Sequence, residues 1–459
     1  MKRTLFSGFD VVATMDDAGR ELKSGYVLVE GNRIVDLGED AAGIMADEVV
    51  RGEGKVLLPG FVNTHHHFYQ TLFRNVPGAS DAKLFDWLVF LYERWKGVGE
   101  EAMRTASSIA CAELLLSGAT TTTDHCYLFP RDGGDVFSAN IEGAQRTGIR
   151  YHPCRGSMSL SKKDGGLPPD SVVQTEAEIL ADCQRAIERW HDPEPLAMLR
   201  IALAPCSPFS VTADLMRQSV EMAEEYGVLL HTHLAETHDE EAFCQRMFGM
   251  RPVELMEDLS WLRDDVWFAH LVVLNEADIA KLAAAKVGLA HCPSSNMILG
   301  SGIAPVTEMK ETGIKISFGV DGSASNDTSN MVREVRQAML LQRVKYGADA
   351  MTAREALRMA TIGGARVMHR DTEIGSIEPG KAADLIAFDM NELPFAGAHA
   401  DPVAAIVHCA ADRVDLSMVN GAWRVRHKQL VDETLLELIP RQNEISKRLT
   451  GSTADEHRT

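Results

Sequence analysis

The stretch Val56-Leu-Leu-Pro-Gly-Phe-Val-Asn-Thr-His-His-His67 joins an apolar run to three consecutive histidines. Side chains alternate across a strand, so His65 and His67 point the same way at the end of one strand, whereas His66 points away. Two imidazoles aimed in one direction can hold a divalent metal. The same triplet also fits a merely polar strand end, so the rest of the chain must decide between the two interpretations.

Short apolar runs recur along the chain and alternate with longer helical patterns, as in βα units around a parallel sheet. We expect strands at 56–62, 119–125, 149–154, 199–204, 228–232, 266–270, 287–291 and 315–320. Helical spacing follows at 172–190 and 211–226, and 83–117 looks like a longer helical insertion. Eight strands with intervening helices predict an α/β fold, a (β/α)8 TIM barrel.

Both flanks of this barrel have strand character. Residues 26–37 alternate around Gly31-Asn32, which predicts a β-hairpin, and strand-like sequence returns at 375–388 and 413–425. We therefore predict a small β-sandwich built from both chain ends. The expected division is a β-sandwich from 1–56 with 376–430, the barrel at 57–375, and a C-terminal helix and tail at 431–459.

Composition limits the classes of partner. The chain has 459 residues, a formal charge of −20 and 45% hydrophobic residues, and its acids are spread along the sequence. This balance argues against nucleic acid or an anionic membrane and favours a small-molecule partner. There is no signal-peptide-like start and no CxxC pair among eight cysteines, so we expect a cytoplasmic protein with reduced thiols.

Polar side chains follow several predicted strands and would meet at one barrel face. His65 and His67 end the first strand, and His233, His270 and Asp321 end the fifth, sixth and eighth. Three imidazoles (His65, His67, His233) with one carboxylate (Asp321) leave a position free on a catalytic zinc for water, which predicts metal-assisted hydrolysis. Individually, His270 could be a core histidine and Asp321 could cap a turn.

The pattern Pro59-Gly-Phe-Val-Asn-Thr-His-His-His67, with His233-Leu-Ala-Glu236, His270 and Asp321-Gly322, resembles the amidohydrolase superfamily, in its cytosine and guanine deaminase-like branch. The resemblance covers nearly the whole chain, including Gly375–Leu385. It implies one metal held by His65, His67, His233 and Asp321. Binuclear relatives carry a bridging lysine or glutamate, but here the fourth strand ends in Ala204-Pro-Cys-Ser-Pro208.

Catalytic roles follow from chemistry and agree with the resemblance. Asp321 can ligate the metal and accept a proton from the bound water, and His270 can hydrogen-bond that water. Glu236, close to the metal but not needed as a ligand, is the natural proton shuttle to a ring nitrogen of the substrate. We expect one divalent metal per chain, zinc first, although the same ligands suit iron or manganese.

The segments His65–Asn75 and Ala82–Leu88 are similar to those of 8-oxoguanine deaminases, whose relatives act on isoxanthopterin or hydroxylated triazines. We therefore expect an aminated heterocycle as substrate, with 8-oxoguanine ahead of isoxanthopterin, guanine and hydroxyatrazine-type triazines. Guanine deaminases tend to place an arginine near the fourth strand's end, where this chain has Cys206. The candidate substrate contacts are Gln70, Trp87, His125, Arg155 and Cys206. Trp87 could instead be core, Gln70 a helix cap, and Arg155 part of a salt bridge.

Three rival interpretations remain. The segment Gly375–Ala382 matches a phosphate-binding loop motif except at its last position, where Ala382 replaces the Ser or Thr that would hold magnesium. The same metal site could hydrolyse another bond, such as a cyclic amide or a halogenated ring. The third is a non-enzymatic scaffold protein. The presence of metal-binding side chains at all four ligand positions argues against it. The amphipathic chain ends and exposed barrel helices favour a homo-oligomer.

Overall fold

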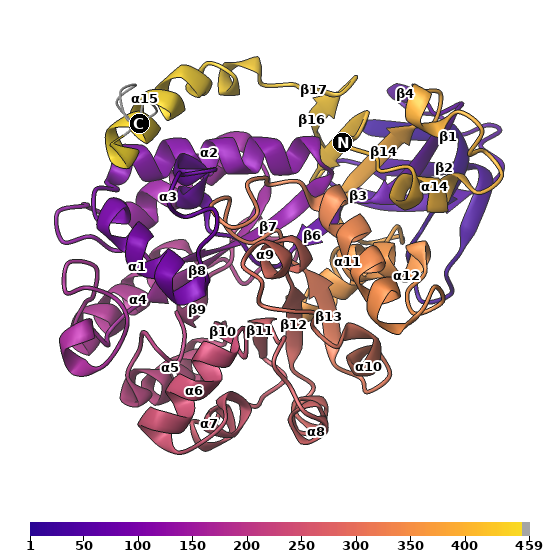
Figure 1. Cartoon of the computed structure of the whole chain (residues 1–459). Coiled ribbons are helices and arrows are strands. Elements are labelled where there is room, and N and C mark those ends of the chain that lie inside the picture. Colours follow the sequence, from indigo (N-terminus) through magenta and orange to yellow (C-terminus); the bar gives the residue numbers. More distant parts are fainter. Residues whose placement is uncertain (452–459) are drawn as a thin grey trace, which may run out of the picture.

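A closed barrel of eight parallel strands forms the centre of the computed structural model, which describes residues 1–451 (Figure 1). The barrel order is β10-β11-β12-β13-β6-β7-β8-β9. Its strands are β6 Phe61–Asn63, β7 Ala119–Cys126, β8 Arg150–Ser157, β9 Ala202–Pro205, β10 Leu229–Leu234, β11 Val266–His270, β12 Gly288–His291 and β13 Lys315–Phe318. The predicted TIM barrel is confirmed.

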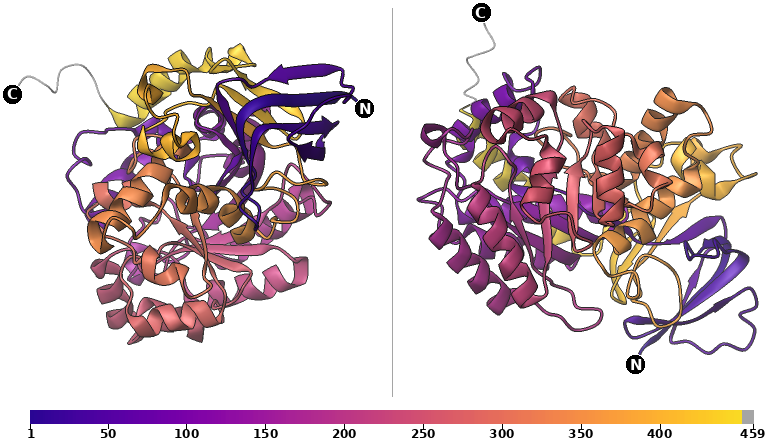
Figure 2. Two further views of the ribbon diagram at one scale, coloured as in Figure 1. Left: turned by 90° about the vertical axis from the view of Figure 1, so that its right-hand side faces the viewer. Right: turned by 90° about the horizontal axis from the view of Figure 1, so that it is seen from below.

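Helices cover the outside of this barrel (Figure 2). They are α1 Leu84–Trp95, α2 Glu100–Leu116, α3 Val136–Thr147, α4 Glu176–Trp190, α5 Ala213–Tyr226, α6 His238–Phe248, α7 Pro252–Asp258, α8 Glu276–Ala284, α9 Pro293–Ile298, α10 Val306–Lys310, α11 Met331–Tyr346, α12 Ala353–Arg358 and α13 Gly364–Val367. The expected helical insertion at 83–117 is two helices, because the chain between Trp95 and Glu100 contains two glycines, which are poor helix formers.

Both chain ends contribute to a second, mixed sheet of nine strands. Its strands are β1 Arg3–Ala13, β2 Glu21–Glu30, β3 Arg33–Gly38, β4 Glu48–Arg51, β5 Lys55–Pro59, β14 Leu385–Asp389, β15 Leu416–Val419, β16 Ala422–Arg426 and β17 Gln429–Leu430. The antiparallel pairing of β2 with β3 confirms the predicted hairpin. Within the predicted strand segment 375–388 only the last residues are extended in the sheet, and α14 Pro402–His408 follows β14.

The predicted strand 56–62 is wrong as a single strand, because it is divided between the two sheets at Gly60. β5 pairs with β1 and β14 of the nine-stranded sheet, whereas β6 pairs with β7 and β13 of the barrel. The Gly60 N–H donates to the Asp384 carbonyl oxygen, and the next N–H, of Phe61, donates to that of Gly118. A Cβ at Gly60 would collide with the Thr120 side chain, so glycine is required at this close approach.

The last described helix, α15 Leu438–Thr450, packs near the start of the barrel's first loop. Gln442 Nε2 donates to Thr71 Oγ1 (3.0 Å), and Ser446 Oγ donates to the Leu72 carbonyl oxygen (2.7 Å). Both partners lie in the 3-10 turn Phe68–Phe73 directly after the histidine triplet. This helix therefore supports the segment that carries the first candidate ligands.

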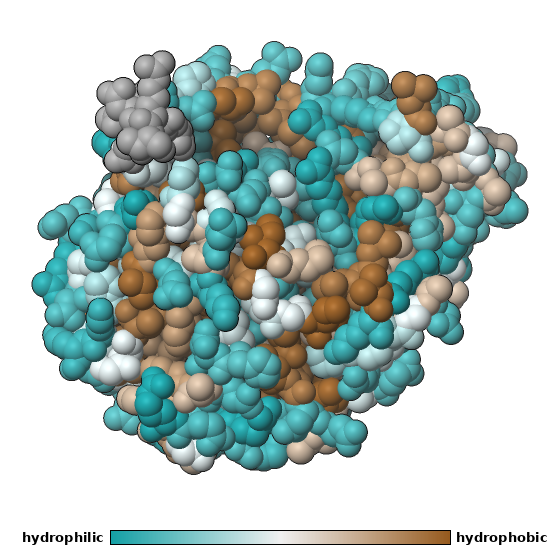
Figure 3. Space-filling model, in the orientation of Figure 1, coloured by the Kyte–Doolittle hydropathy of each residue, from teal (hydrophilic) through white to brown (hydrophobic). Residues whose placement is uncertain are grey.

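The surface and the cysteines fit a globular chain with a large core. Figure 3 shows a mostly hydrophilic face with apolar side chains in scattered patches. Seven of the eight cysteines are buried, as expected of small apolar side chains. Among residues 1–451, no helix combines the length and the apolar character needed to cross a bilayer.

Candidate metal centre and active site

Four predicted ligands from three strand ends meet at the carboxyl face of the barrel. Asp321 Oδ1 lies 3.3 Å from Nε2 of both His65 and His67, and His67 Nε2 lies 3.2 Å from His233 Nε2. Four ligands arranged tetrahedrally about 2.1 Å from a zinc ion would be about 3.4 Å apart. The observed separations therefore match the edges of a metal coordination polyhedron.

The donor atoms themselves also fit a metal. His65 Nε2 is buried and has no hydrogen-bond partner among the described residues. Burial of such an atom is unfavourable unless something binds it. Three imidazole nitrogens and one carboxylate oxygen are the donor set that divalent zinc, iron or manganese accepts.

The remaining nitrogen of each ligand imidazole is fixed by the barrel. His67 Nδ1 donates to the His125 carbonyl oxygen (2.9 Å), and His233 Nδ1 donates to that of Cys206 (2.6 Å). These bonds hold a proton on each Nδ1 and turn both Nε2 atoms toward the centre, which is the tautomer that a metal ligand requires.

His65 is oriented through a second histidine. His231 Nδ1 donates to the Trp267 carbonyl oxygen (2.8 Å), so its Nε2 is free to accept from His65 Nδ1 (2.8 Å). The His231 ring also stacks on the Trp267 indole, with the ring centroids 4.3 Å apart. This chain of contacts fixes the tautomer of His65 that offers Nε2 to a metal.

Burial and the central carboxylate set the charges of the cluster. Burial holds the pKa of His65 and His233 well below the usual value, which keeps their imidazoles neutral. Burial alone would raise the pKa of Asp321, but the neighbouring imidazoles of His65 and His67 hold it well below its ordinary value. The pKa of His67 differs from these: burial would lower it, but the contact with Asp321 raises it above the usual value. The centre therefore combines an ionised carboxylate with the neutral imidazoles of His65 and His233.

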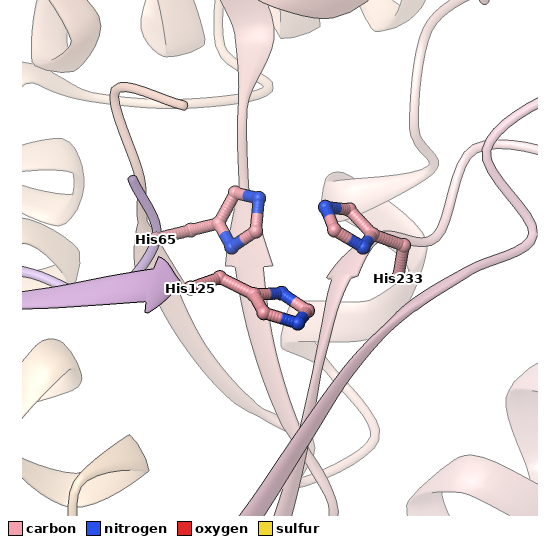
Figure 4. A group of neighbouring side chains, drawn as sticks. All are labelled: His65, His125 and His233. Atoms are coloured by element: carbon pink, nitrogen blue, oxygen red, sulfur yellow. The ribbon is translucent and has the colours of Figure 1, made fainter. Parts of the chain in front are cut away.

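Two further histidines border the cluster. Potential ligand atoms of His65, His125 and His233 lie within 4.8 Å of one another (Figure 4). Those of His65, His270 and Asp321 lie equally close together. His125 Nε2, however, donates to the Ala204 carbonyl oxygen (2.9 Å). We therefore favour the four predicted residues, whose donor atoms make the closest contacts.

Glu236 and His270 lie together beside the cluster. His270 Nε2 is 3.5 Å from Glu236 Oε2 and 3.9 Å from Asp321 Oδ2, while its Nδ1 donates to Asn296 Oδ1 (2.9 Å). Burial, with a contribution from the Asp321 charge, raises the pKa of Glu236 to about 8. A carboxyl group that holds a proton at neutral pH beside a metal site can act as a general acid.

The backbone is strained where these groups are presented. His270 (φ 77°) and Asp321 (φ 60°) have left-handed conformations, as does Ala235 (φ 52°), directly before Glu236. Such conformations are uncommon for residues other than glycine and gather at functional sites. The strain coincides with the residues that sequence patterns select as catalytic.

A pocket opens onto the cluster, and three of the five predicted substrate contacts, Gln70, Trp87 and Cys206, line it. The Trp87 indole N–H donates to the Ala324 carbonyl oxygen (3.2 Å), which holds the ring as a wall of the pocket. The prediction did not identify Tyr92, Tyr127 and Phe209, which also line it. The pocket thus offers aromatic surfaces and neutral polar groups.

The other two predicted contacts do not line this pocket. Arg155 is fully buried, donates from Nε to Asp182 (2.7 Å) and stacks on Phe129, which favours the alternative of a salt bridge over a substrate contact. Cys154 faces the barrel interior, and alternation along β8 turns Arg155 outward. His125 faces the interior but is bonded to the barrel wall, beneath the pocket.

Sequence reasoning missed the residues that hold the catalytic groups in place. His231 lies two positions before His233, so the alternation that aimed His233 inward also aimed His231 inward. Asn296 lies in α9, beyond the end of the seventh strand β12, where strand alternation gives no signal. His66 contacts Ser329 and points away from the cluster, as predicted.

The chain is similar to known proteins over most of its length. The model of the amidohydrolase family matches residues 56–424. A protein named 8-oxoguanine deaminase from Pseudomonas aeruginosa is 47% identical over 93% of this chain and 95% of its own length. Hydroxydechloroatrazine ethylaminohydrolase from Pseudomonas sp. (strain ADP) is 35% identical over 92% of this chain and 91% of its own length. A crystal structure of atrazine chlorohydrolase from Arthrobacter aurescens TC1, complexed with zinc, superimposes with a TM-score of 0.93. Its sequence is 33% identical, and the match covers 96% of this chain and 100% of that chain.

Proposed function

The chain belongs to the amidohydrolase family, and from that premise we propose that it hydrolyses 8-oxoguanine to urate and ammonia. In this reaction a C–O bond forms between water and the ring carbon that bears the amino group, and the C–N bond to that group breaks. The nitrogen leaves as ammonia, and the ring carbon becomes a carbonyl. No oxidant or reductant is needed.

The residues proposed to hold the metal are His65, His67, His233 and Asp321. A divalent metal bound there would supply a water molecule acidic enough to ionise near neutral pH. We propose one metal per chain and zinc as its identity. The zinc complex of the similar atrazine chlorohydrolase supports this choice, and elemental analysis of the purified protein tests it against iron and manganese.

The protein groups around this position supply the proton transfers. Asp321 Oδ1 contacts the imidazoles, which leaves Oδ2, on the side of His270, to accept a proton from the attacking water. His270 Nε2 is placed to hydrogen-bond the same water. Glu236 gives its proton to a ring nitrogen, which makes the neighbouring amidine carbon easier to attack. Asp321 then passes the proton taken from water to the departing amino group, which leaves as ammonia, and the hydroxyl proton of the adduct returns to Glu236 as the carbonyl forms.

The pocket suits a flat, neutral heterocycle. Trp87 offers a face for the ring, and Gln70 offers an amide that can both donate to and accept from a purine edge. Cys206 occupies the end of β9. We propose these three residues as substrate contacts, together with Tyr92 and Tyr127.

One observation carries the choice of 8-oxoguanine over related heterocycles. The identity is 47% to the protein named 8-oxoguanine deaminase, against 35% to the hydroxydechloroatrazine enzyme and 34% to a protein named isoxanthopterin deaminase. Among the described residues that line the pocket there is no lysine or arginine, so the ring carbonyls would be bound by groups such as Gln70.

The proposal is tested by ammonia release from 8-oxoguanine, guanine, isoxanthopterin and hydroxyatrazine at equal metal loading. We expect the highest kcat/KM for 8-oxoguanine, with urate as the second product. Glu236→Gln in metal-replete protein should lower kcat by about a thousandfold, because general acid–base groups contribute roughly 10²–10⁴-fold. No turnover of 8-oxoguanine by the metal-loaded wild type would refute the substrate, and wild-type turnover by the variant would refute the role of Glu236.

Three further proposals concern the whole chain. We propose the predicted division into a β-sandwich domain (1–56 with 376–430), a barrel (57–375) and a C-terminal helix and tail (431–459), with the first boundary moved to Gly60, where the chain passes from β5 to β6. We also propose a cytoplasmic homo-oligomer. Light scattering of the purified protein tests the oligomer directly.

A further inference from the structure

Glu240 has no role in the chemistry above, yet its carboxylate is fully buried directly behind Glu236. Its Oε1 accepts the N–H of Ala235 and its Oε2 accepts the N–H of Glu236, each at 2.9 Å. One side chain therefore holds two successive peptide groups, and the second belongs to the proposed proton shuttle.

This contact differs from an ordinary helix cap. In α4 and α12, a glutamate three residues after the cap accepts the N–H of the cap residue itself, as Glu178 does from Thr175 and Glu355 from Thr352. Glu240 occupies the same position in α6, whose cap is Thr237. Its carboxylate instead reaches past the cap to the two preceding residues.

The turn held by Glu240 is also fixed from its other side. The N–H groups of Val272 and Val273, just beyond His270, donate to the Ala235 carbonyl oxygen at 2.9 and 2.8 Å. The peptide that precedes Glu236 is thus bound both to α6 and to the loop that carries His270. Because Ala235 has a left-handed conformation, which costs energy for alanine, these bonds are needed to keep it.

We propose that Glu240 is a positioning residue that holds the Glu236 carboxyl group against His270 and over the metal centre. The inference rests on the proposed role of Glu236. Burying a carboxylate is unfavourable unless its oxygens accept hydrogen bonds. Here both oxygens accept backbone N–H groups of the turn that positions the Glu236 side chain. Loss of either bond lets the Ala235–Glu236 peptide rotate and moves the Glu236 carboxyl group away from the substrate.

Glu240→Gln is the sharpest test, since the amide keeps the shape of the side chain but replaces one acceptor by a donor facing an N–H. A displacement of about 1 Å at a catalytic group can cost on the order of 10²-fold in rate. We expect kcat for 8-oxoguanine to fall about 10- to 100-fold, with KM within about threefold and metal content equal to wild type. The matched control is Glu178→Gln, an exposed capping-box glutamate, which should leave kcat unchanged.

A double-mutant cycle separates positioning from general destabilisation. If Glu240 acts only through Glu236, then Glu236→Gln/Glu240→Gln should be no slower than Glu236→Gln alone, measured at high enzyme concentration. An additional loss of tenfold or more in the double variant, or wild-type kcat in Glu240→Gln, would overturn the inference. Wild-type turnover in Glu236→Gln would instead overturn the proposed function. Should Glu240→Gln not fold, Glu240→Asp, whose carboxylate is one methylene shorter, enters the same cycle with the same two outcomes.

Discussion

His231→Phe should weaken metal binding without touching any ligand. The phenyl ring keeps the stacking on Trp267 but removes the nitrogen that accepts the hydrogen bond from His65 Nδ1. In the metal-free variant, His65 can move its proton to Nε2 and donate it to Asp321 Oδ1, 3.3 Å away. Metal binding then forces the proton back to Nδ1, where no acceptor remains.

The size of the effect follows from that buried donor. An unsatisfied buried N–H costs about 1–3 kcal/mol, and each 1.4 kcal/mol corresponds to a factor of ten in Kd. Partners of metal ligands typically contribute 10- to 100-fold in affinity. We therefore expect the metal Kd of His231→Phe to rise about 10- to 100-fold, which competition against a chromogenic chelator measures directly.

A matched control is available in the same barrel. His152 is also buried on a barrel strand, but neither ring nitrogen has a partner among the described residues. His152→Phe removes no hydrogen bond and should leave the metal Kd unchanged. A Kd for His231→Phe within about threefold of wild type, in protein with native circular dichroism, would refute the account of how His65 is oriented, as would an equal loss in His152→Phe.

Three more outcomes are expected. Gly319→Ala would place a Cβ 2.5 Å from the His65 Cβ and should therefore reduce the metal content of the purified protein. The control is Gly99→Ala, whose Cβ would meet nothing closer than 3.6 Å and which should bind metal normally. A fully metallated Gly319→Ala protein would contradict this expectation. Because the pKa of Glu236 is raised to about 8, its carboxyl group holds a proton at neutral pH and loses it as the pH rises. We therefore expect kcat to fall above about pH 8. A kcat that stays constant at alkaline pH would argue against Glu236 as the general acid. Arg155→Met should cost about 1–2 kcal/mol in a denaturant titration, because it removes hydrogen bonds to Gln174 and to Asp182, which is partly exposed and keeps its pairing with Arg185. The preference for 8-oxoguanine over guanine should stay unchanged, and an altered preference would support Arg155 as a substrate contact.

The barrel and its ligands could be predicted because two simple periodicities coincide. Strand alternation aims His65 and His67 together, and a closed parallel sheet brings every strand end to one face, where His233 and Asp321 join them. Neither inference needs knowledge of loops. The fold, and the clustering of the candidate ligands at one barrel face, were therefore accessible from the spacing of polar residues after apolar runs.

Substrate contacts and supporting residues were less accessible because they depend on which face a residue occupies and on distant partners. Arg155 follows Cys154, which faces the barrel interior, and so points outward. The sequence alone does not show which of these two neighbouring residues faces inward. Trp87 reaches the pocket only because α1 packs over it. The apolar run at 56–62 carries no signal that its two halves join different sheets, since both halves are buried.

The division at Gly60 links metal binding to the stability of the whole chain. The last residue of β5 precedes Gly60 in the nine-stranded sheet, and His65 follows Gly60 by only a few residues of continuous backbone, so the sheet cannot detach without displacing a ligand. Any metal bound by the native protein stabilises it by RT ln(1 + [M]/Kd). That free energy is shared by the sheet, whose strands contain no ligand. Chelation should therefore lower the unfolding temperature of both parts together, as one cooperative unit.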